Sequence, residues 1–174
     1  MDILTSIHGK SIGLGPNGEL ILDKDGQQTV IPVGSSRVVS CTANVTVSKD
    51  SHEGRTLIAN KADGISFTLP AATGSGDRYR IVVGTAITSN NLTVVVTGDD
   101  VFTGHALMDD GDGEPANGWP TASNTNRITM GGTSNATGGT KGDIIELEDI
   151  AADTWSVRIT GVQSGSEATP FSNV

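Results

Sequence analysis

Aromatic residues are scarce in this sequence. Phe, Trp and Tyr together make up 3% of its 174 residues, so a core must be built largely from Val, Ile, Leu and Ala. A core with few large anchors gains stability when subunits associate, because each subunit then buries further apolar surface at roughly 25 cal/mol per Å². The composition therefore favours an oligomer.

Cysteine is nearly absent as well. The single residue, Cys41, excludes an internal disulfide and a cysteine metal cluster within one chain. Cys41 lies in the run Val38 to Thr42, where small apolar and polar residues follow one another. We interpret it as a small buried thiol rather than a reactive nucleophile.

The sequence also lacks long apolar runs and clusters of basic residues. No apolar span of about 18 residues occurs, and the N-terminal MDILTSIHGK has no basic segment followed by an apolar one. Its 11 Lys and Arg residues face 20 Asp and Glu, giving a net charge of −9. Binding to phosphate backbones needs clustered positive charge. We therefore expect neither a membrane nor a nucleic acid as partner.

Short runs with a period of two dominate what is present. The runs 65–69 and 79–83 alternate apolar and polar residues, as strands with one buried face do, and a glycine-rich segment between them predicts a hairpin. The runs 143–150 and 154–160 predict a second hairpin, with Trp155 as a core anchor. No segment keeps a helical period. The predicted fold is all-β: an antiparallel, jelly-roll-like β-sandwich or barrel with an N-terminal β-hairpin arm.

Two regions stand apart from the regular strands. Residues 1–36 hold closely spaced turn signals, Asn17-Gly18 and Asp25-Gly26, and predict a small β-meander arm that must dock on something, because an isolated meander is marginal in water. Residues 37–174 form the body. Within it, 97–142 is a long polar insertion of the kind that is usually functional or tied down by partners.

Sequence motifs for catalysis and cofactors are missing or lack their context. Gly13 to Gly18 matches the dinucleotide pattern formally, but a turn follows it where a helix is required, so we expect no cofactor. His8, His52 and His105 show no metal-binding spacing, and no Gly-x-Ser-x-Gly elbow supports a hydrolase triad. The sequence predicts a protein that is not an enzyme.

One acidic stretch resembles the start of an oxygen-ligand metal loop. Asp110, Asp112 and Glu114 alternate in the run DDGDGE, as carboxylates do in calcium loops. The full calcium-loop pattern with its distal bidentate Glu is missing. We expect a solvated acidic loop, with these three residues as the calcium alternative.

Three phrases carry a family resemblance: HEGRT at 52–56, TLPAATGSGDRY at 68–79 and KGDIIELED at 141–149. In this order they resemble tailed-bacteriophage virion proteins, in particular the small capsid decoration (cement) proteins of podovirus-like phages. The resemblance extends over roughly residues 50 to 171 and includes the closing EATPFS at 167–172. Similar β-modules also occur in head fibres and tail proteins.

The resemblance implies a catalytically silent structural protein, a homotrimer seated on the capsid exterior and bound to the major capsid protein. Its N-terminal arm would contact the shell, and the body would trimerise. The alternative is a head-fibre or tail-fibre module that binds a host glycan or receptor through segment 97–142, with Trp119 as an exposed stacking residue. The interface candidates from both interpretations are Leu20, Leu22, Val30, Ile31, Trp119 and Phe171.

Overall fold

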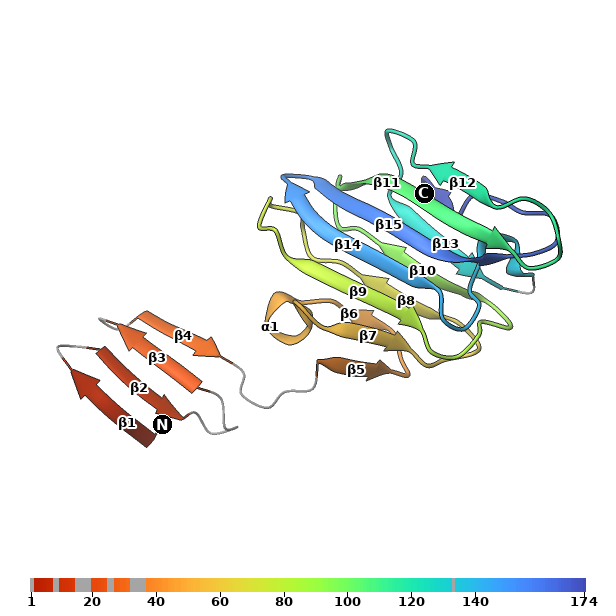
Figure 1. Ribbon diagram of the computed structural model, residues 1–174. Helices are drawn as coiled ribbons and strands as arrows, with labels where there is room; N and C mark the ends of the chain where they lie inside the picture. Colours follow the sequence, from red (N-terminus) through yellow and green to blue (C-terminus); the bar gives the residue numbers. More distant parts are fainter. Residues whose placement is uncertain (1, 8–9, 15–19, 25–26, 32–36, 133) are drawn as a thin grey trace. The chain divides into compact units, whose positions relative to one another are not determined.

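The computed structural model describes the whole chain except residues 1, 8–9, 15–19, 25–26, 32–36 and 133 (Figure 1). The chain divides into two compact units, Met1–Ser36 and Arg37–Val174. The expected turns at Asn17-Gly18 and Asp25-Gly26 and the GPNG stretch fall outside the described residues. Each unit is described by itself.

The first unit is a four-stranded antiparallel sheet in the order β1-β2-β3-β4, which confirms the expected N-terminal meander. Ile21 is buried, while its neighbours Leu20 and Leu22 are half-buried and Ile12 is 38% exposed. A sheet this small covers little apolar surface on its own. The bounds are β1 (Asp2–Ile7), β2 (Lys10–Leu14), β3 (Leu20–Lys24) and β4 (Gln27–Ile31).

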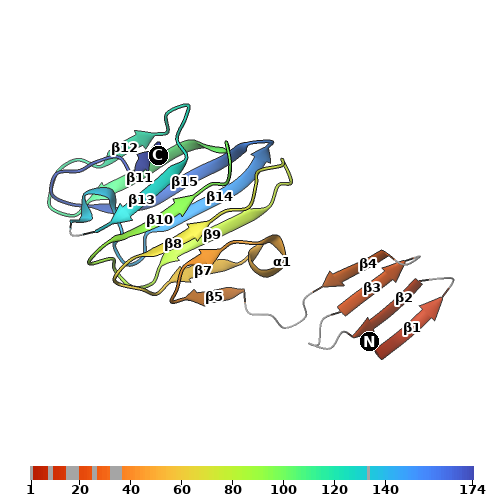
Figure 2. The same cartoon turned by 180° about the vertical axis from the view of Figure 1, so that it is seen from behind.

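The second unit is a sandwich of two sheets, seen from both sides in Figures 1 and 2, and it confirms the all-β class. The seven-stranded sheet has the order β12 (Asn117–Pro120), β11 (Val101–Asp110), β15 (Thr154–Gln163), β14 (Ile144–Ala151), β9 (Arg78–Val83), β7 (Thr56–Ala59), β5 (Val38–Cys41). The five-stranded sheet has the order β16 (Phe171–Ser172), β13 (Arg127–Gly131), β10 (Asn91–Val95), β8 (Ile65–Thr68), β6 (Val45–Thr46). Two short helices, α1 (Lys49–His52) and η1 (Asn135–Thr137), complete it.

The strand pairing of the body is mixed rather than antiparallel throughout. From β5 to β10 the chain alternates between the two sheets, and neighbouring strands of one sheet pair in parallel: β5 with β7 and β7 with β9 in one sheet, and β6 with β8 and β8 with β10 in the other. This winding is that of a two-sheeted β-solenoid. The predicted hairpin of 65–69 with 79–83 is therefore wrong, because β8 and β9 lie in different sheets and the loop between them crosses the sandwich. A period of two identifies a buried face but not the partner strand.

The later strands follow the sequence more closely. β14 and β15 form the expected antiparallel hairpin, and β14 joins it to the solenoid strands by pairing with β9. The segment 97–142 is not a single polar excursion, since it contains β11, β12 and β13, and β11 pairs in parallel with β15 over ten residues. Its alternation of buried Phe102, Ala106 and Met108 includes Gly104, whose missing side chain hides the pattern.

The core is one continuous cluster between the two sheets of the body. Trp155 is 1% exposed and its ring lies 5.8 Å from that of Tyr79, which confirms it as a core anchor. Cys41 is 5% exposed, as expected for a small buried thiol. Among the described residues, no helix is long and apolar enough to span a membrane.

Candidate functional site

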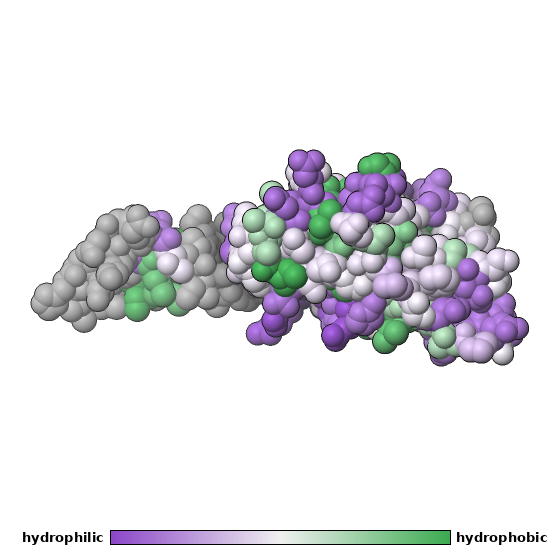
Figure 3. Space-filling model, turned by 90° about the horizontal axis from the view of Figure 1, so that it is seen from above, coloured by the Kyte–Doolittle hydropathy of each residue, from purple (hydrophilic) through white to green (hydrophobic). Residues whose placement is uncertain are grey.

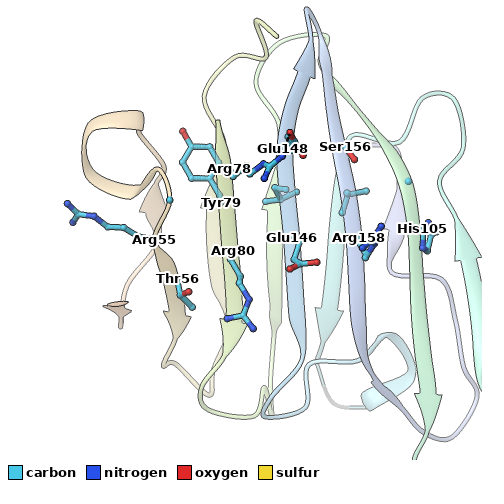
Figure 4. A pocket seen from close by; sticks show the side chains of 14 residues that line it. Arg55, Thr56, Arg78, Tyr79, Arg80, His105, Glu146, Glu148, Ser156 and Arg158 are labelled. Carbon is cyan, nitrogen blue, oxygen red and sulfur yellow. Dashed lines mark hydrogen bonds and ion pairs between the residues drawn. The ribbon is translucent and has the colours of Figure 1, made fainter. Parts of the chain in front are cut away.

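The outer face of the seven-stranded sheet gathers arginines from several strands. Tyr79 and Ile81 of β9 point into the core, so the alternation of the strand places Arg78 and Arg80 on the outside. The pairing register then sets Arg80 beside Glu146 of β14, Glu146 beside Arg158 of β15, and Arg158 beside His105 of β11. We call Arg80, Glu146, Arg158 and His105 the charged row; Figure 4 shows it crossing the sheet.

A second row lies beside the charged row on the same face. Arg78 of β9 stands next to Glu148 of β14, and Glu148 next to Ser156 of β15. The guanidinium Nη2 of Arg78 lies 2.8 Å from Oε1 of Glu148, an ion pair in which Arg78 stays 72% exposed. A pair so exposed contributes little to stability.

The charged row differs from this neighbouring pair. In the described part of the chain, Arg80, Glu146 and Arg158 take part in no ion pair within 4.0 Å. Glu146 and Arg158 are exposed and Arg80 is half-buried. These three charged groups can therefore meet groups of a partner without breaking contacts of their own.

A hollow of about 550 Å³ lies over the two rows. Four arginines reach it, Arg55, Arg78, Arg80 and Arg158, against two carboxylates, Glu146 and Glu148. The whole chain carries a net charge of −9, so this face is locally basic on an acidic protein.

A third row on the same face is apolar. The register places Val82 of β9 beside Ile144 of β14, and both are half-buried. Further along the row, Leu107 of β11 is 55% exposed. Figure 3, which looks on the molecule from above, shows apolar groups as separate spots among polar ones. The apolar row is Val82, Ile144 and Leu107, interrupted by Thr160 between the last two and bordered on one side by the charged row.

The face is held in place by a buried carboxylate beneath its edge. Asp149 is 2% exposed and accepts the backbone N–H groups of Thr73, Gly74 and Ser75 at 2.7 to 3.1 Å, and the Ser75 hydroxyl at 2.8 Å. Burial acts to raise the pKa of Asp149, but these donors outweigh it and hold the pKa well below its usual range. A second buried carboxylate, Asp100, accepts the N–H of Ala72 at 2.7 Å.

These contacts explain two of the phrases behind the family resemblance. The loop of TLPAATGSGDRY is fastened to the last residue of KGDIIELED, and strands β9 and β14 of the same two phrases pair side by side. The two phrases therefore form one structural unit. They position the charged row.

The acidic candidates are only partly brought together. Asp110 and Asp112 lie with Glu167, one carboxylate oxygen of each within 4.8 Å of the others. Glu114 is not in this group; its backbone N–H donates to Asp110 instead. The N–H of Gly165 donates to Asp112 at 2.8 Å, so the loop and the C-terminal segment are tied together. Asp112 is exposed and Asp110 and Glu167 are half-buried, and exposed acidic groups are common without an ion.

Two of the interface candidates, Trp119 and Phe171, pack within the body itself. Trp119 is half-buried against the core, and its Nε1 donates to Oε1 of Gln163 at 2.9 Å, so the expectation of an exposed stacking residue is wrong. Phe171 is 8% exposed in β16, which pairs with β13 of the same chain. Val30 and Ile31 lie in β4, but their side chains are outside the described residues.

The charged row was not predicted from the sequence. Its signal was the alternation of Arg78 with Arg80 and of Glu146 with Glu148, which marks polar outer faces. Only the register shows that these strands are neighbours. Comparison of the chain with models of known protein families and with curated proteins gives no match.

Proposed function

We propose that this protein is a structural component of a tailed-phage virion that decorates the outside of the capsid and stabilises it by bridging shell subunits. The observation that supports this most is the division of the chain. A body with its own continuous core is joined to a separate four-stranded sheet that leaves Ile12 exposed and Leu20 and Leu22 half-buried. Such a small sheet gains stability by docking on another surface.

The stabilising mechanism would be additive. Each copy buries surface across more than one shell subunit, so opening the shell also requires breaking the contacts of every decorating copy. Many modest interfaces together then resist the pressure of packaged DNA. The partner is the major capsid protein, and the role involves no catalysis, cofactor, membrane or nucleic acid.

The fibre alternative loses its main support. It relied on Trp119 as an exposed stacking residue, and that side chain is hydrogen-bonded and half-buried. The hollow on the outer face is lined by charged and small side chains, with the buried Tyr79 as the aromatic contributor. A glycan array with the full chain would favour the fibre role if it gave saturable binding.

Capsids that lack the protein provide the test. The full chain should co-sediment with them at saturation and raise the temperature at which they release DNA. A variant with Leu20→Ala and Leu22→Ala should keep the folded body and lose binding, since it shortens two half-buried apolar side chains of the first unit. Gln28→Ala with Thr29→Ala, at two exposed positions of the same sheet, is the matched control.

Two results would count against the proposal. The first is that the full chain fails to bind the capsids. The second is that it binds without any effect on DNA release. If Leu20→Ala with Leu22→Ala binds as well as the control, the role of the first unit in docking is wrong, while decoration itself stands.

A further inference from the structure

The outer face of the seven-stranded sheet is complementary to itself. On its three rows, β9 and β14 carry opposite or matching groups at equal heights: Arg80 beside Glu146, Arg78 beside Glu148, and Val82 beside Ile144. A twofold axis that runs along the strands between β9 and β14 would bring β9 of one copy over β14 of the other. Each row would then meet its own complement.

We propose that this face binds the same face of a second copy, forming a twofold-symmetric pair. Arg80 of each copy faces Glu146 of the other, Arg78 faces Glu148, and Val82 faces Ile144. Sheets that pack face to face stand about 10 Å apart, a gap that arginine and glutamate side chains bridge from both sides. The hollow of about 550 Å³ over the rows gives these long side chains room.

Charge distinguishes this occupant from others. Phosphate groups would be attracted by the arginines but would lie against Glu146 and Glu148, in the middle of the face, and leave both carboxylates without partners. A uniformly acidic protein would likewise satisfy the arginines and leave the two glutamates unpaired. A surface with alternating charges that borders an apolar strip satisfies both the arginines and the glutamates, and the chain itself carries such a surface.

The alternative twofold axes fit less well. An axis along β14 would place Glu146 over Glu146 and Arg80 over Arg158, so like charges would meet. An axis between β14 and β15 would match Glu146 with Arg158 but leave Arg78 and Glu148 without charged partners. The axis between β9 and β14 alone matches both charged rows and the apolar row.

The face offers a contact at the small end of the range for specific interfaces. About this axis β9, β7 and β5 lie over β14, β15 and β11 of the other copy, so six strands overlap, with four to six residues in the shorter strand of each facing pair. At about 4.8 Å between strands and about 3.3 Å per residue, the flat footprint is about 450 Å². The accessible area of a corrugated surface exceeds its footprint, and a standard interface buries about 800 Å² on each partner. The exposed Leu107 and half-buried Ile144 and Val82 supply the apolar part.

Light scattering on the purified full chain tests the pair directly. At low salt and micromolar concentration the mass should be twice 17.8 kDa. Arg80→Glu alone and Glu146→Arg alone should each weaken self-association at least about 100-fold, because each puts like charges against each other twice per pair. Mixing these two variants should restore association to within about tenfold of wild type, since one face then carries two positive groups and the other two negative ones.

Arg158→Glu is the matched control because it reverses the same charge on the same face. In the proposed pair its side chain faces Thr56, so it should associate like wild type and should not rescue Glu146→Arg. Circular dichroism of each variant separates loss of association from loss of folding.

Three results would overturn the pair. They are a wild-type monomer at about 100 micromolar, a trimer that persists in Glu146→Arg, and rescue of Glu146→Arg by Arg158→Glu rather than by Arg80→Glu. The trimer implied by the family resemblance would need a heterologous surface instead of this self-complementary one. The inference does not rest on the proposed function, since it concerns the isolated protein.

Discussion

Replacing Asp149 by Asn should destabilise the body markedly, because its carboxylate is buried and accepts several N–H groups. The carboxylate accepts N–H groups through both oxygens: Gly74 donates to Oδ1 at 2.7 Å, and Ser75 donates to Oδ2 at 3.0 Å. Asparagine keeps one acceptor and turns the other into an NH₂ group that faces a donor. One buried N–H then loses its partner, and the remaining hydrogen bonds lose their charge.

The expected cost can be worked out from these contacts. An unsatisfied buried donor costs about 1 to 3 kcal/mol, and hydrogen bonds to a charged group are worth about 1.5 to 3 kcal/mol against about 1 for neutral ones. The sum is about 3 kcal/mol. For a protein of this size that corresponds to a fall in Tm of roughly 10 °C. Asp153→Asn removes the same charge at a nearby exposed position whose φ of 58° asparagine tolerates, and it should change little.

Acid should remove the difference between Asp149→Asn and wild type. The pKa of Asp149 is lower in the folded state than in the unfolded state, so folding is favoured by its ionised form. Its contribution is complete above the unfolded pKa of about 4 and is lost as the pH falls further towards the folded value. Urea titrations at neutral pH and below about pH 4 would show this. A cost within about 0.5 kcal/mol of that of Asp153→Asn at neutral pH would refute the reasoning.

Three further predictions use single residues. Gly104→Ala should prevent folding or cost more than about 3 kcal/mol, because the added Cβ would lie 1.8 Å from the carbonyl oxygen of Val157. Gly118→Ala in β12 is the tolerated control, because its Cβ would lie 3.8 Å from the side chain of Leu107. Equal denaturant midpoints for the two variants would contradict this prediction. Burial raises the pKa of Tyr79, the single tyrosine, to about 12, so the absorbance of its phenolate should appear only near that pH in the folded protein, and ionisation near pH 10 would contradict this. The stability that the neutral side chain supports is complete below the unfolded pKa of about 10 and should fall as the pH rises from about 10 to about 12. Burial also raises the pKa of the Cys41 thiol, so Ellman's reagent should react slowly with the native protein and rapidly in guanidinium chloride, and equal rates would contradict this.

The sequence by itself determined the class of the fold and much of its core. A period of two is a local property of a strand, so the alternation in 65–69, 79–83 and 154–160 identified buried faces correctly and placed Trp155 and Cys41 inside. The turn signals of residues 1–36 likewise predicted a meander, because neighbouring antiparallel strands need only short connections.

Only the tertiary structure decided which strands are neighbours. Strand pairing is a long-range property, and the crossing of 70–77 between the sheets depends on Asp100 and Asp149, which follow that loop at a distance in the chain. The charged row arises in the same way. Arg80, Glu146 and Arg158 come from three strands that the register sets side by side, so no local pattern in the sequence could show that they form one face.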